Sequence, residues 1–251
     1  MTAPFGVRRV ELRSRRVIGP YVVLGAVDER SRAQPGQFYM LASAERWGGG
    51  DHERPYLGRA VSVMAVADDA SIEFLLEDVG PGTKRLCELA PGEGLLIVGP
   101  LGNGFTAPSV GTDLLLVGGG IGIAPLVGLQ QTWGGRALLG FRDAHHAKAV
   151  ELFTDPILAT DDGSTGHAGP VTDLLEAELE TRPTTIYACG PPAMLEAVRD
   201  RAASHGVASQ LALEAPMACG FGACYGCVVA TLDGYRRVCV DGPVFDGALL
   251  A

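Results

Sequence analysis

Apolar residues in the first hundred positions come in short runs of strand length, separated by turn residues. Closely spaced short strands of this kind are typical of a β-sandwich or barrel. One segment, residues 83–89, is expected to be a helix because it follows the turn residues Gly80 to Gly82. The pattern predicts a small antiparallel barrel over residues 1–105, with strands near residues 7–13, 21–26, 37–42, 60–66, 72–77 and 94–98.

The pattern changes near residue 112, where strands and helices begin to alternate. The first strand of this region is continuously apolar, as in a parallel strand buried on both faces. Thr172 or Asp173 is placed to cap the second helix. Such alternation predicts a parallel α/β domain over residues 106–212, and residues 213–251 are too few for a core of their own. Strands are expected at 113–117, 136–141 and 184–188, and helices at 124–132, 172–180 and 193–204.

Composition limits the functions that the chain can have. No stretch approaches the ~20 uninterrupted apolar residues that span a membrane, although 47% of the 251 residues are apolar. A net charge of −9 argues against nucleic acid or an anionic membrane as a partner. The first residues lack the apolar segment of a signal peptide. We therefore expect a cytoplasmic location, where disulfides are rare.

Four cysteines near the C-terminus carry the most specific chemistry: Cys219, Cys224, Cys227 and Cys239. Their spacing, C-x4-C-x2-C-x11-C, is the plant-type run that binds a [2Fe–2S] cluster. Three close thiolates can surround one side of a cluster, and a hairpin can bring the fourth back. A structural zinc site and disulfides are the alternatives, but zinc sites usually pair two C-x2-C motifs and disulfides need an oxidising compartment. The spacing favours a centre that moves electrons one at a time.

A glycine-rich turn follows the first α/β strand and opens a helix. Gly118, Gly120 and Gly122 let the backbone approach a pyrophosphate at a helix N-terminus. The run is not a strict G-x-G-x-x-G, so a tight turn without a ligand is the alternative. Cys189 and Gly190 end a later strand at the same sheet edge, where they are placed to border a nicotinamide. The alternative for Cys189 is a buried structural cysteine.

Two charged residues follow the next strand, and they favour different nucleotides. Asp143 lies 23 positions after Gly120, where a carboxylate accepts from a ribose 2′-hydroxyl and favours NAD. Arg142 beside it suits the 2′-phosphate of NADP. Both side chains are equally compatible with a solvated loop.

Four residues of the predicted barrel are suited to a flavin nucleotide. Arg59 suits a pyrophosphate, and the hydroxyl of Ser62 suits the edge of a flavin ring. Gly82 and Thr83 at a helix start offer a second phosphate contact. Taken singly, each of the four is as compatible with an exposed strand or loop.

Together these segments resemble the ferredoxin reductase superfamily, in which a flavin barrel precedes a pyridine-nucleotide domain. The whole chain is similar to the iron–sulfur and FAD type within it, the electron-transfer subunits of NAD-dependent dihydroorotate dehydrogenases. The residues that carry the match are 99–105, 117–125, 162–164, 171–173, 189–191, 213–227 and 238–245.

The resemblance implies cofactors and roles for single residues. FAD would bind in the barrel, with Arg59 on its pyrophosphate, Ser62 near the flavin ring, and Gly82 and Thr83 completing the phosphate site. The family commonly has Pro where this chain has Ala60. The four cysteines would hold the [2Fe–2S] cluster, and NAD would be the co-substrate.

The resemblance also implies a partner and a pathway. A catalytic subunit with FMN would oxidise dihydroorotate in pyrimidine biosynthesis, in a heterotetramer with two copies of each subunit. Electrons would pass singly to the cluster and then to FAD, which reduces NAD⁺ by hydride transfer. No acid–base catalytic residue is expected of this chain. Alternatives are a related NAD(P)H–flavin reductase subunit of a sulfhydrogenase, bifurcating transhydrogenase or oxygenase system, and a zinc or redox-sensing protein without turnover.

Overall fold

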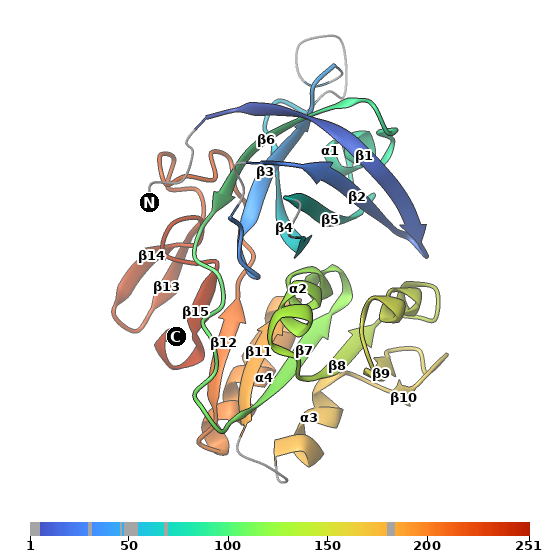
Figure 1. Ribbon diagram of the computed structural model, residues 1–251. Helices are drawn as coiled ribbons and strands as arrows, with labels where there is room; N and C mark the ends of the chain where they lie inside the picture. Colours follow the sequence, from blue (N-terminus) through green and yellow to red (C-terminus); the bar gives the residue numbers. More distant parts are fainter. Residues whose placement is uncertain (1–5, 30–31, 46, 48–54, 68–69, 180–183) are drawn as a thin grey trace.

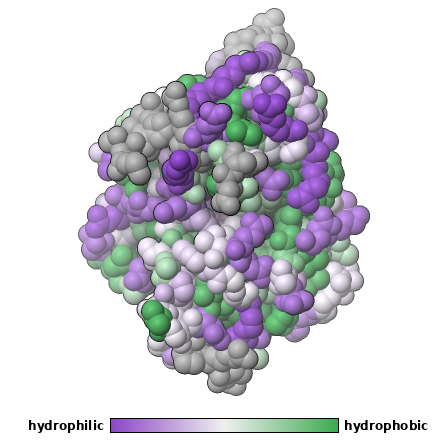
Figure 2. All heavy atoms as spheres, in the orientation of Figure 1, coloured by the Kyte–Doolittle hydropathy of each residue, from purple (hydrophilic) through white to green (hydrophobic). Residues whose placement is uncertain are grey.

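The chain folds into a β-barrel lobe and an α/β lobe that pack against each other, with the C-terminal segment along one side of both (Figure 1). This computed structural model describes residues 6–29, 32–45, 47, 55–67, 70–179 and 184–251. On the face shown in Figure 2, hydrophilic and hydrophobic residues are interspersed. No helix in the described part of the chain is both long and apolar enough to cross a membrane.

Six strands form the closed barrel in the order β1-β2-β5-β4-β3-β6, and each pairs antiparallel with its neighbours. Alternating side chains such as Leu24, Leu41 and Phe74 are fully buried inside it. The predicted antiparallel barrel is confirmed, and the one helix, α1 (Pro81–Cys87), begins two residues before its predicted start. The strands are β1 (Arg8–Ile18), β2 (Tyr21–Val27), β3 (Phe38–Ser43), β4 (Arg59–Val66), β5 (Ser71–Glu77) and β6 (Gly94–Leu101).

The second lobe is a seven-stranded sheet in the order β10-β9-β8-β7-β11-β12-β15, parallel except for β15. The three predicted strands are present as β7, β8 and β11. The others have only two to five residues, which is too short for a clear apolar pattern. The strands are β7 (Asp113–Gly119), β8 (Arg136–Phe141), β9 (Ile157–Thr160), β10 (His167–Ala168), β11 (Thr184–Cys189), β12 (Ala208–Ala212) and β15 (Val244–Asp246).

Helices cover both faces of this sheet. Helix α2 (Ala124–Trp133) packs toward the barrel, while α3 (Thr172–Leu179) and α4 (Pro192–Ser204) share a second apolar cluster on the other face. The predicted capping of α3 is wrong, because the helix begins at Thr172 and both Thr172 and Asp173 lie inside its first turn. Residue 180, the last of the predicted helix, lies outside the described residues.

A continuous apolar cluster joins the two lobes. It combines Ile18, Tyr21 and Met64 of the barrel with Leu126 and other residues of α2 and the sheet. The backbones approach closely at Gly128, where a Cβ atom would lie 2.7 Å from the carbonyl oxygen of Met64. The seam between the lobes is therefore built from buried apolar surface and has a fixed geometry.

The C-terminal segment is mounted on the outside of the barrel and then returns to the sheet. Strands β13 (Val228–Thr231) and β14 (Gly234–Arg237) form the expected hairpin between Cys227 and Cys239. Val238 and Phe245 pack with Phe38, Met40 and Leu101 of the barrel. Strand β15 pairs with β12, so the segment is held at both ends by the rest of the fold.

Candidate cofactor and nucleotide sites

A cavity of about 250 Å³ lies where the barrel, the α/β lobe and the C-terminal segment meet. Apolar side chains form most of its wall, and a few polar groups converge on it, which is the usual composition of a cofactor site. The sequence prediction placed Ser62 and Thr83 in a flavin site, and both line this cavity. Its wall includes Phe38, Ser62, Leu76, Thr83, Ile121, Ala124, Glu214, Ala215, Met217 and Pro243.

The predicted phosphate-binding residues of the barrel lie together at its edge. Arg59 is the first residue of β4, and its Nη1 donates to the carbonyl of Leu57 at 2.6 Å. The Arg59 guanidinium lies directly against Gly82, where a side chain would displace it. The hydroxyl of Thr83 donates to the carbonyl of Gly80 at 3.0 Å. Arginine, glycine and a helix start thus meet beside the cavity, as a pyrophosphate group requires.

The glycine turn and the Cys189–Gly190 segment also lie against each other. Gly120 follows β7 with a positive φ of 54°, which favours glycine. A Cβ atom on Gly122 would lie 2.6 Å from the carbonyl oxygen of Cys189 and from Gly190. Strands β7 and β11 pair so that Gly118 is opposite Cys189. Two motifs that are far apart in the sequence therefore form one backbone surface at the carboxyl edge of the sheet, where nucleotides bind in α/β folds.

A second cavity, of about 230 Å³, lies in front of this surface. Backbone of the glycine turn and of the end of β8 forms one wall. Residues of the barrel close the opposite side. The lining residues include Tyr21, Glu77, Gly119, Gly120, Arg142, His146, Asp161, Pro191 and Met194.

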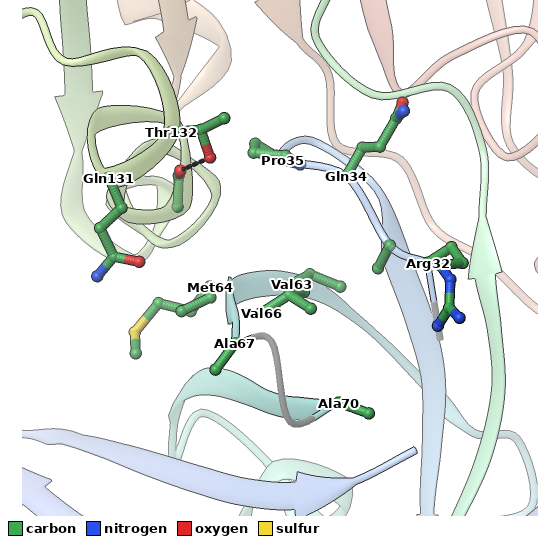
Figure 3. Close-up of a pocket in the computed structure, with 13 residues that line it drawn as sticks. Arg32, Gln34, Pro35, Val63, Met64, Val66, Ala67, Ala70, Gln131 and Thr132 are labelled. Carbon is green, nitrogen blue, oxygen red and sulfur yellow. Dashed lines mark hydrogen bonds between the residues drawn. The ribbon is translucent and has the colours of Figure 1, made fainter. Parts of the chain in front are cut away.

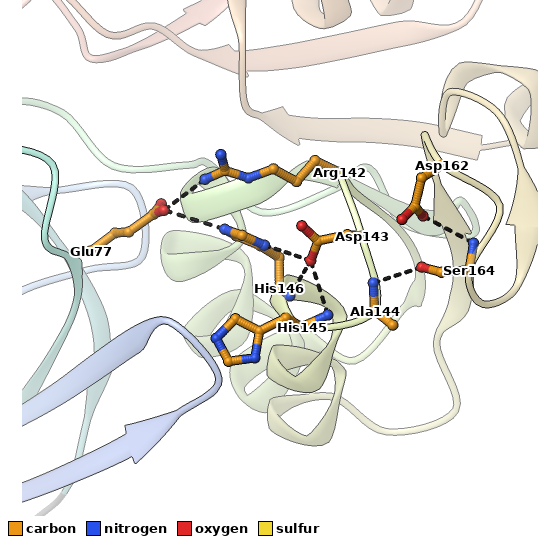
Figure 4. A network of polar contacts seen from close by, with 8 residues as sticks. All are labelled: Glu77, Arg142, Asp143, Ala144, His145, His146, Asp162 and Ser164. Carbon is orange, nitrogen blue, oxygen red and sulfur yellow. Dashed lines mark hydrogen bonds and ion pairs between the residues drawn. The ribbon is translucent and has the colours of Figure 1, made fainter.

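Asp143 is fixed at the start of the 3₁₀ helix η2 (His146–Leu152). Its Oδ1 accepts hydrogen bonds from the backbone N–H groups of His145 and His146, both at 2.9 Å, and lies 2.7 Å from His146 Nδ1 (Figure 4). The side-chain contact with His146, with the backbone bonds, lowers the pKa of Asp143 to about 2. Ser164 accepts from the N–H of Ala144 at 2.7 Å and ties the next loop to this one. Asp143 is therefore an ionised, oriented carboxylate.

Glu77, Tyr21 and His146 line the second cavity although the sequence interpretation gave them no role. Glu77 is the last residue of β5, and its position opposite Tyr21 depends on the pairing of β5 with β2. His146 packs edge-on against Tyr21, with ring centroids 5.8 Å apart. No pattern in the sequence marked Glu77, because β5 also contains Glu73 and because the contact of Glu77 with His146 crosses between lobes.

Cys189 and Glu214 lie close enough to influence each other at the first cavity. Burial raises the pKa of the Cys189 thiol, and the Glu214 charge raises it further, so the thiol stays protonated. Glu214 is an exposed residue, yet desolvation of its carboxylate raises its pKa as well. Sequence reasoning marked Glu214 only as the start of the cysteine segment. The structure adds it to the polar groups of the cavity wall.

The four cysteines of the C-terminal segment associate two by two. The sulfurs of Cys227 and Cys239 lie 3.2 Å apart, and Cys219 hydrogen-bonds with the side chain of Cys224. All four are free thiols. Among the described residues, no three His, Cys, Asp or Glu side chains are arranged to hold a single metal ion. Two pairs of thiolates suit a cluster with two irons, each of which takes two cysteines.

Backbone N–H groups point at these sulfurs. Desolvation raises the pKa of Cys219, but hydrogen bonds from the backbone of Phe221, Cys224 and Ala223 and from the Cys224 side chain outweigh it and lower the pKa to about 6. Gly226 donates to the Cys224 sulfur at 3.4 Å. Donors of this kind stabilise thiolates and tune the metal that they hold. The residues present therefore fit a [2Fe–2S] cluster.

The cysteine segment borders the first cavity and a further apolar hollow. Met217 lines the first cavity, two residues before Cys219. On the other side of Cys219 lies a hollow of about 410 Å³, whose wall includes Trp47, Tyr56 and Phe221. Tyr56 is 80% exposed and Phe221 50% exposed. Cys219 thus lies between the first cavity and an open apolar hollow.

A larger cavity than these, about 690 Å³, lies elsewhere. It lies between β4 and the C-terminal half of α2, and its wall includes Val63, Met64, Gln131 and Thr132 (Figure 3). The hydroxyl of Thr132 donates within its own helix to Gly128 at 2.7 Å. None of the predicted site residues line this cavity, so its size does not mark the site.

Comparison with known proteins gives a consistent result. Residues 214–251 match the iron–sulfur cluster binding domain of dihydroorotate dehydrogenase B. The chain is 38% identical over 222 residues to the dihydroorotate dehydrogenase B (NAD⁺) electron transfer subunit of Clostridium acetobutylicum. This alignment covers 86% of each chain. It is 36% identical over 262 residues to the corresponding subunit of Bacillus caldolyticus, in an alignment that covers 96% of each chain.

Solved structures with the same architecture include that of an NADH-dependent reduced ferredoxin–NADP oxidoreductase involved in flavin-based electron bifurcation. The match has a TM-score of 0.83 and 26% identity and covers 96% of this chain and 89% of the other. A ferredoxin–NADP⁺ reductase from Neisseria gonorrhoeae with bound FAD and NADP shares the fold, with a TM-score of 0.63 and 20% identity, over 80% of this chain and 92% of that one.

Proposed function

This chain belongs to the family of dihydroorotate dehydrogenase B (NAD⁺) electron transfer subunits, and from that premise we propose how its residues share the task. It is an oxidoreductase subunit of the FAD, [2Fe–2S] and NAD type. When bound, the cluster exchanges one electron at a time, and the flavin exchanges one or two. The observation that carries the proposal is the 250 Å³ cavity, whose wall joins the barrel, the glycine turn and the segment leading to Cys219.

We assign FAD to the barrel, residues 1–105. Arg59, Gly82 and Thr83 would bind its pyrophosphate, and Ser62 would contact the edge of the ring. The contact between Arg59 and Gly82, and the presence of Ser62 and Thr83 in one cavity wall, support this assignment. The apolar side chains around Ser62 would exclude water from the ring.

NAD is assigned to residues 106–212. Gly118, Gly120 and Gly122 would bring the backbone to its pyrophosphate, and Cys189 and Gly190 would border the nicotinamide. The close contact between these two segments supports the assignment.

The ribose is assigned to Asp143. Oδ1 of this residue is occupied by the η2 backbone and by His146, so Oδ2 would accept from the ribose 2′-hydroxyl. The low pKa of Asp143 keeps the carboxylate an acceptor at neutral pH.

The cluster is assigned to residues 213–251, held by Cys219, Cys224, Cys227 and Cys239. The catalytic partner would be the FMN-containing subunit that oxidises dihydroorotate, in a cytoplasmic heterotetramer of two copies of each. We place its docking surface on the exposed apolar hollow beside Cys219, where Tyr56 and Phe221 contribute. Aromatic side chains of this kind are enriched in protein interfaces.

The test is an anaerobic reduction of the purified subunit and of its Cys224→Ser variant. NADH should bleach the bound FAD in both, because the nucleotide sites lie apart from this thiolate. With the FMN subunit and dihydroorotate added, only the parent should form NADH from NAD⁺ at the coupled rate. A Cys224→Ser variant that couples at the parent rate would rule out the cysteines as the link between subunits.

A further inference from the structure

One ionic contact crosses between the lobes at the wall of the second cavity. Glu77, at the end of β5 in the barrel, accepts through Oε1 from Nη2 of Arg142 at 2.9 Å (Figure 4). Nε2 of His146 lies 3.4 Å from the same oxygen. The Glu77 side chain is only 17% exposed, whereas that of Arg142 is 62% exposed. A largely buried carboxylate of the barrel therefore binds an exposed arginine of the α/β lobe.

The place of Arg142 gives this contact a consequence for nucleotide choice. Arg142 follows β8 at the carboxyl edge of the sheet, beside Asp143, where an arginine accommodates the 2′-phosphate of NADP. Among the described residues that line the cavity, it is the one with a permanent positive charge. A guanidinium paired with a neighbouring carboxylate is a poorer phosphate ligand, because the phosphate must displace an existing charge-assisted bond.

We propose that Glu77 is a specificity-determining residue, which holds the Arg142 guanidinium away from the ribose and thereby disfavours NADPH against NADH. The inference rests on the proposed placement of the nucleotide at the glycine turn. It assigns to a residue of the flavin lobe the selection of a nucleotide bound by the other lobe.

The charges around the cavity act in the same direction. Glu77 and Asp161 line it, and Asp143 is ionised at its edge. A 2′-phosphate entering here would meet three carboxylates and one arginine that is already paired. Of the three, Glu77 is the least exposed, so solvent and salt screen its repulsion of a phosphate the least.

The position of Glu77 is fixed from several sides. Strand pairing places Glu77 directly opposite Tyr21, whose buried ring packs edge-on against His146. His146 is in turn held by Asp143 through Nδ1. Arg142 is the most exposed member of the group, so removal of the Glu77 charge leaves its guanidinium free to turn toward a bound phosphate.

The alternative is that Glu77 merely ties the two lobes together. The chain offers a matched control, because Arg16 of β1 and Glu151 of η2 form a second ion pair across the same seam at 3.5 Å. Both of these side chains are about half exposed and lie outside the cavity lining. Loss of this pair removes an inter-lobe contact without freeing a cation at the nucleotide.

The experiment measures kcat/KM for NADH and NADPH with the FAD-loaded protein and an artificial electron acceptor. Glu77→Gln should raise the NADPH-to-NADH ratio by roughly tenfold or more, the effect expected when a charged ligand becomes available to a phosphate. Glu77→Asp, which keeps the charge, should retain the preference of the parent. The double variant Glu77→Gln/Arg142→Ala should lose the gain, and Glu151→Gln should show none.

Calorimetric titration with 5′-AMP and with adenosine 2′,5′-bisphosphate gives a readout that needs no electron transfer. Glu77→Gln should strengthen binding of the bisphosphate relative to 5′-AMP. An unchanged preference with normal 5′-AMP binding would overturn the Glu77 assignment alone. If the parent binds neither probe, both the nucleotide placement and this inference fail. An equal change in Glu151→Gln would show that the effect is only loosening of the seam, which also overturns the inference.

Discussion

The cysteine segment and the nucleotide cavities are built in different ways. The four thiols lie between residues 219 and 239, and one hairpin brings the last of them to the others. The two cavities take their walls from residues as far apart as Tyr21 and Pro243. The cysteine site is formed by local chain geometry and has a distinctive ligand chemistry. The two cavities depend on packing between lobes and are lined by ordinary side chains and glycine backbone.

This difference determines how each site responds to substitution. The proposed cluster site depends on each of its four thiolates, so loss of one should remove a metal–ligand bond. In the cavities, several contacts share the binding, so single changes should have graded effects. Substitutions in and beside the cavity walls test this comparison. Some of them change only the packing, and one changes only the charge.

The largest effect beside the cavities is expected for Gly122→Ala, in the glycine turn. The new Cβ would lie 2.6 Å from the Cys189 carbonyl oxygen and would force the glycine turn and the Cys189–Gly190 segment apart. Overpacking of this kind costs about 2 kcal/mol, which for a chain of this size lowers the midpoint of thermal unfolding by about 5 °C. NADH binding should weaken as well, and calorimetry of the FAD-loaded protein measures both.

Gly80→Ala is the matched control for this variant. Gly80 has an extended backbone and no atom within 4 Å of an added Cβ. Its unfolding midpoint should stay within about 2 °C of the parent, since surface changes of this kind are usually within ~0.5 kcal/mol. Equal shifts in the two variants would contradict the tight contact between the glycine turn and Cys189.

The same contrast explains what the sequence could predict. The barrel, the β7 and β8 strands and the cysteine hairpin follow from apolar runs and residue spacing, and the structure confirms them. Strand β12 was missed because five residues are too few to show a clear apolar pattern. The predicted capping of α3 was wrong because the helix already begins at Thr172, so its capping position is the residue before the two predicted caps.

At the candidate sites, contacts between residues that are far apart in the sequence could not be predicted. Sequence reasoning marked the glycine turn and Cys189 separately, but their contact depends on the pairing of β11 with β7. Glu77 was given no role, and His146 was expected in an exposed loop without a role, because their contact crosses between lobes and leaves the His146 side chain only 12% exposed. The spacing of the four cysteines was informative because the ligands and the turn that joins them lie in one segment.

A smaller effect is expected for Glu214→Gln. Desolvation raises the pKa of Glu214 in the folded protein above its unfolded value. The folded state therefore holds this proton more tightly than the unfolded state, so the parent loses stability as the pH rises from the unfolded pKa through the folded pKa. Glutamine does not titrate, so the variant should become more stable relative to the parent over that window.

The difference between Glu214→Gln and the parent should stay under about 1 kcal/mol, since Glu214 is an exposed residue whose charge solvent screens. Unfolding by urea at a series of pH values from 4 upward measures it. A difference that is independent of pH would contradict the raised pKa and would remove Glu214 from the desolvated wall of the cavity.

Iron and acid-labile sulfide analysis, combined with EPR of the reduced protein, tests the central claim most directly. The parent should contain roughly two irons and two sulfides per chain, and its reduced form should give the signal of a [2Fe–2S] cluster. Cys227→Ser, which alters one of the buried paired thiols, should lose both, whereas Cys87→Ser, at a buried thiol of α1, should retain them. Bound zinc in the parent, or an intact cluster in Cys227→Ser, would contradict the assignment of the four cysteines.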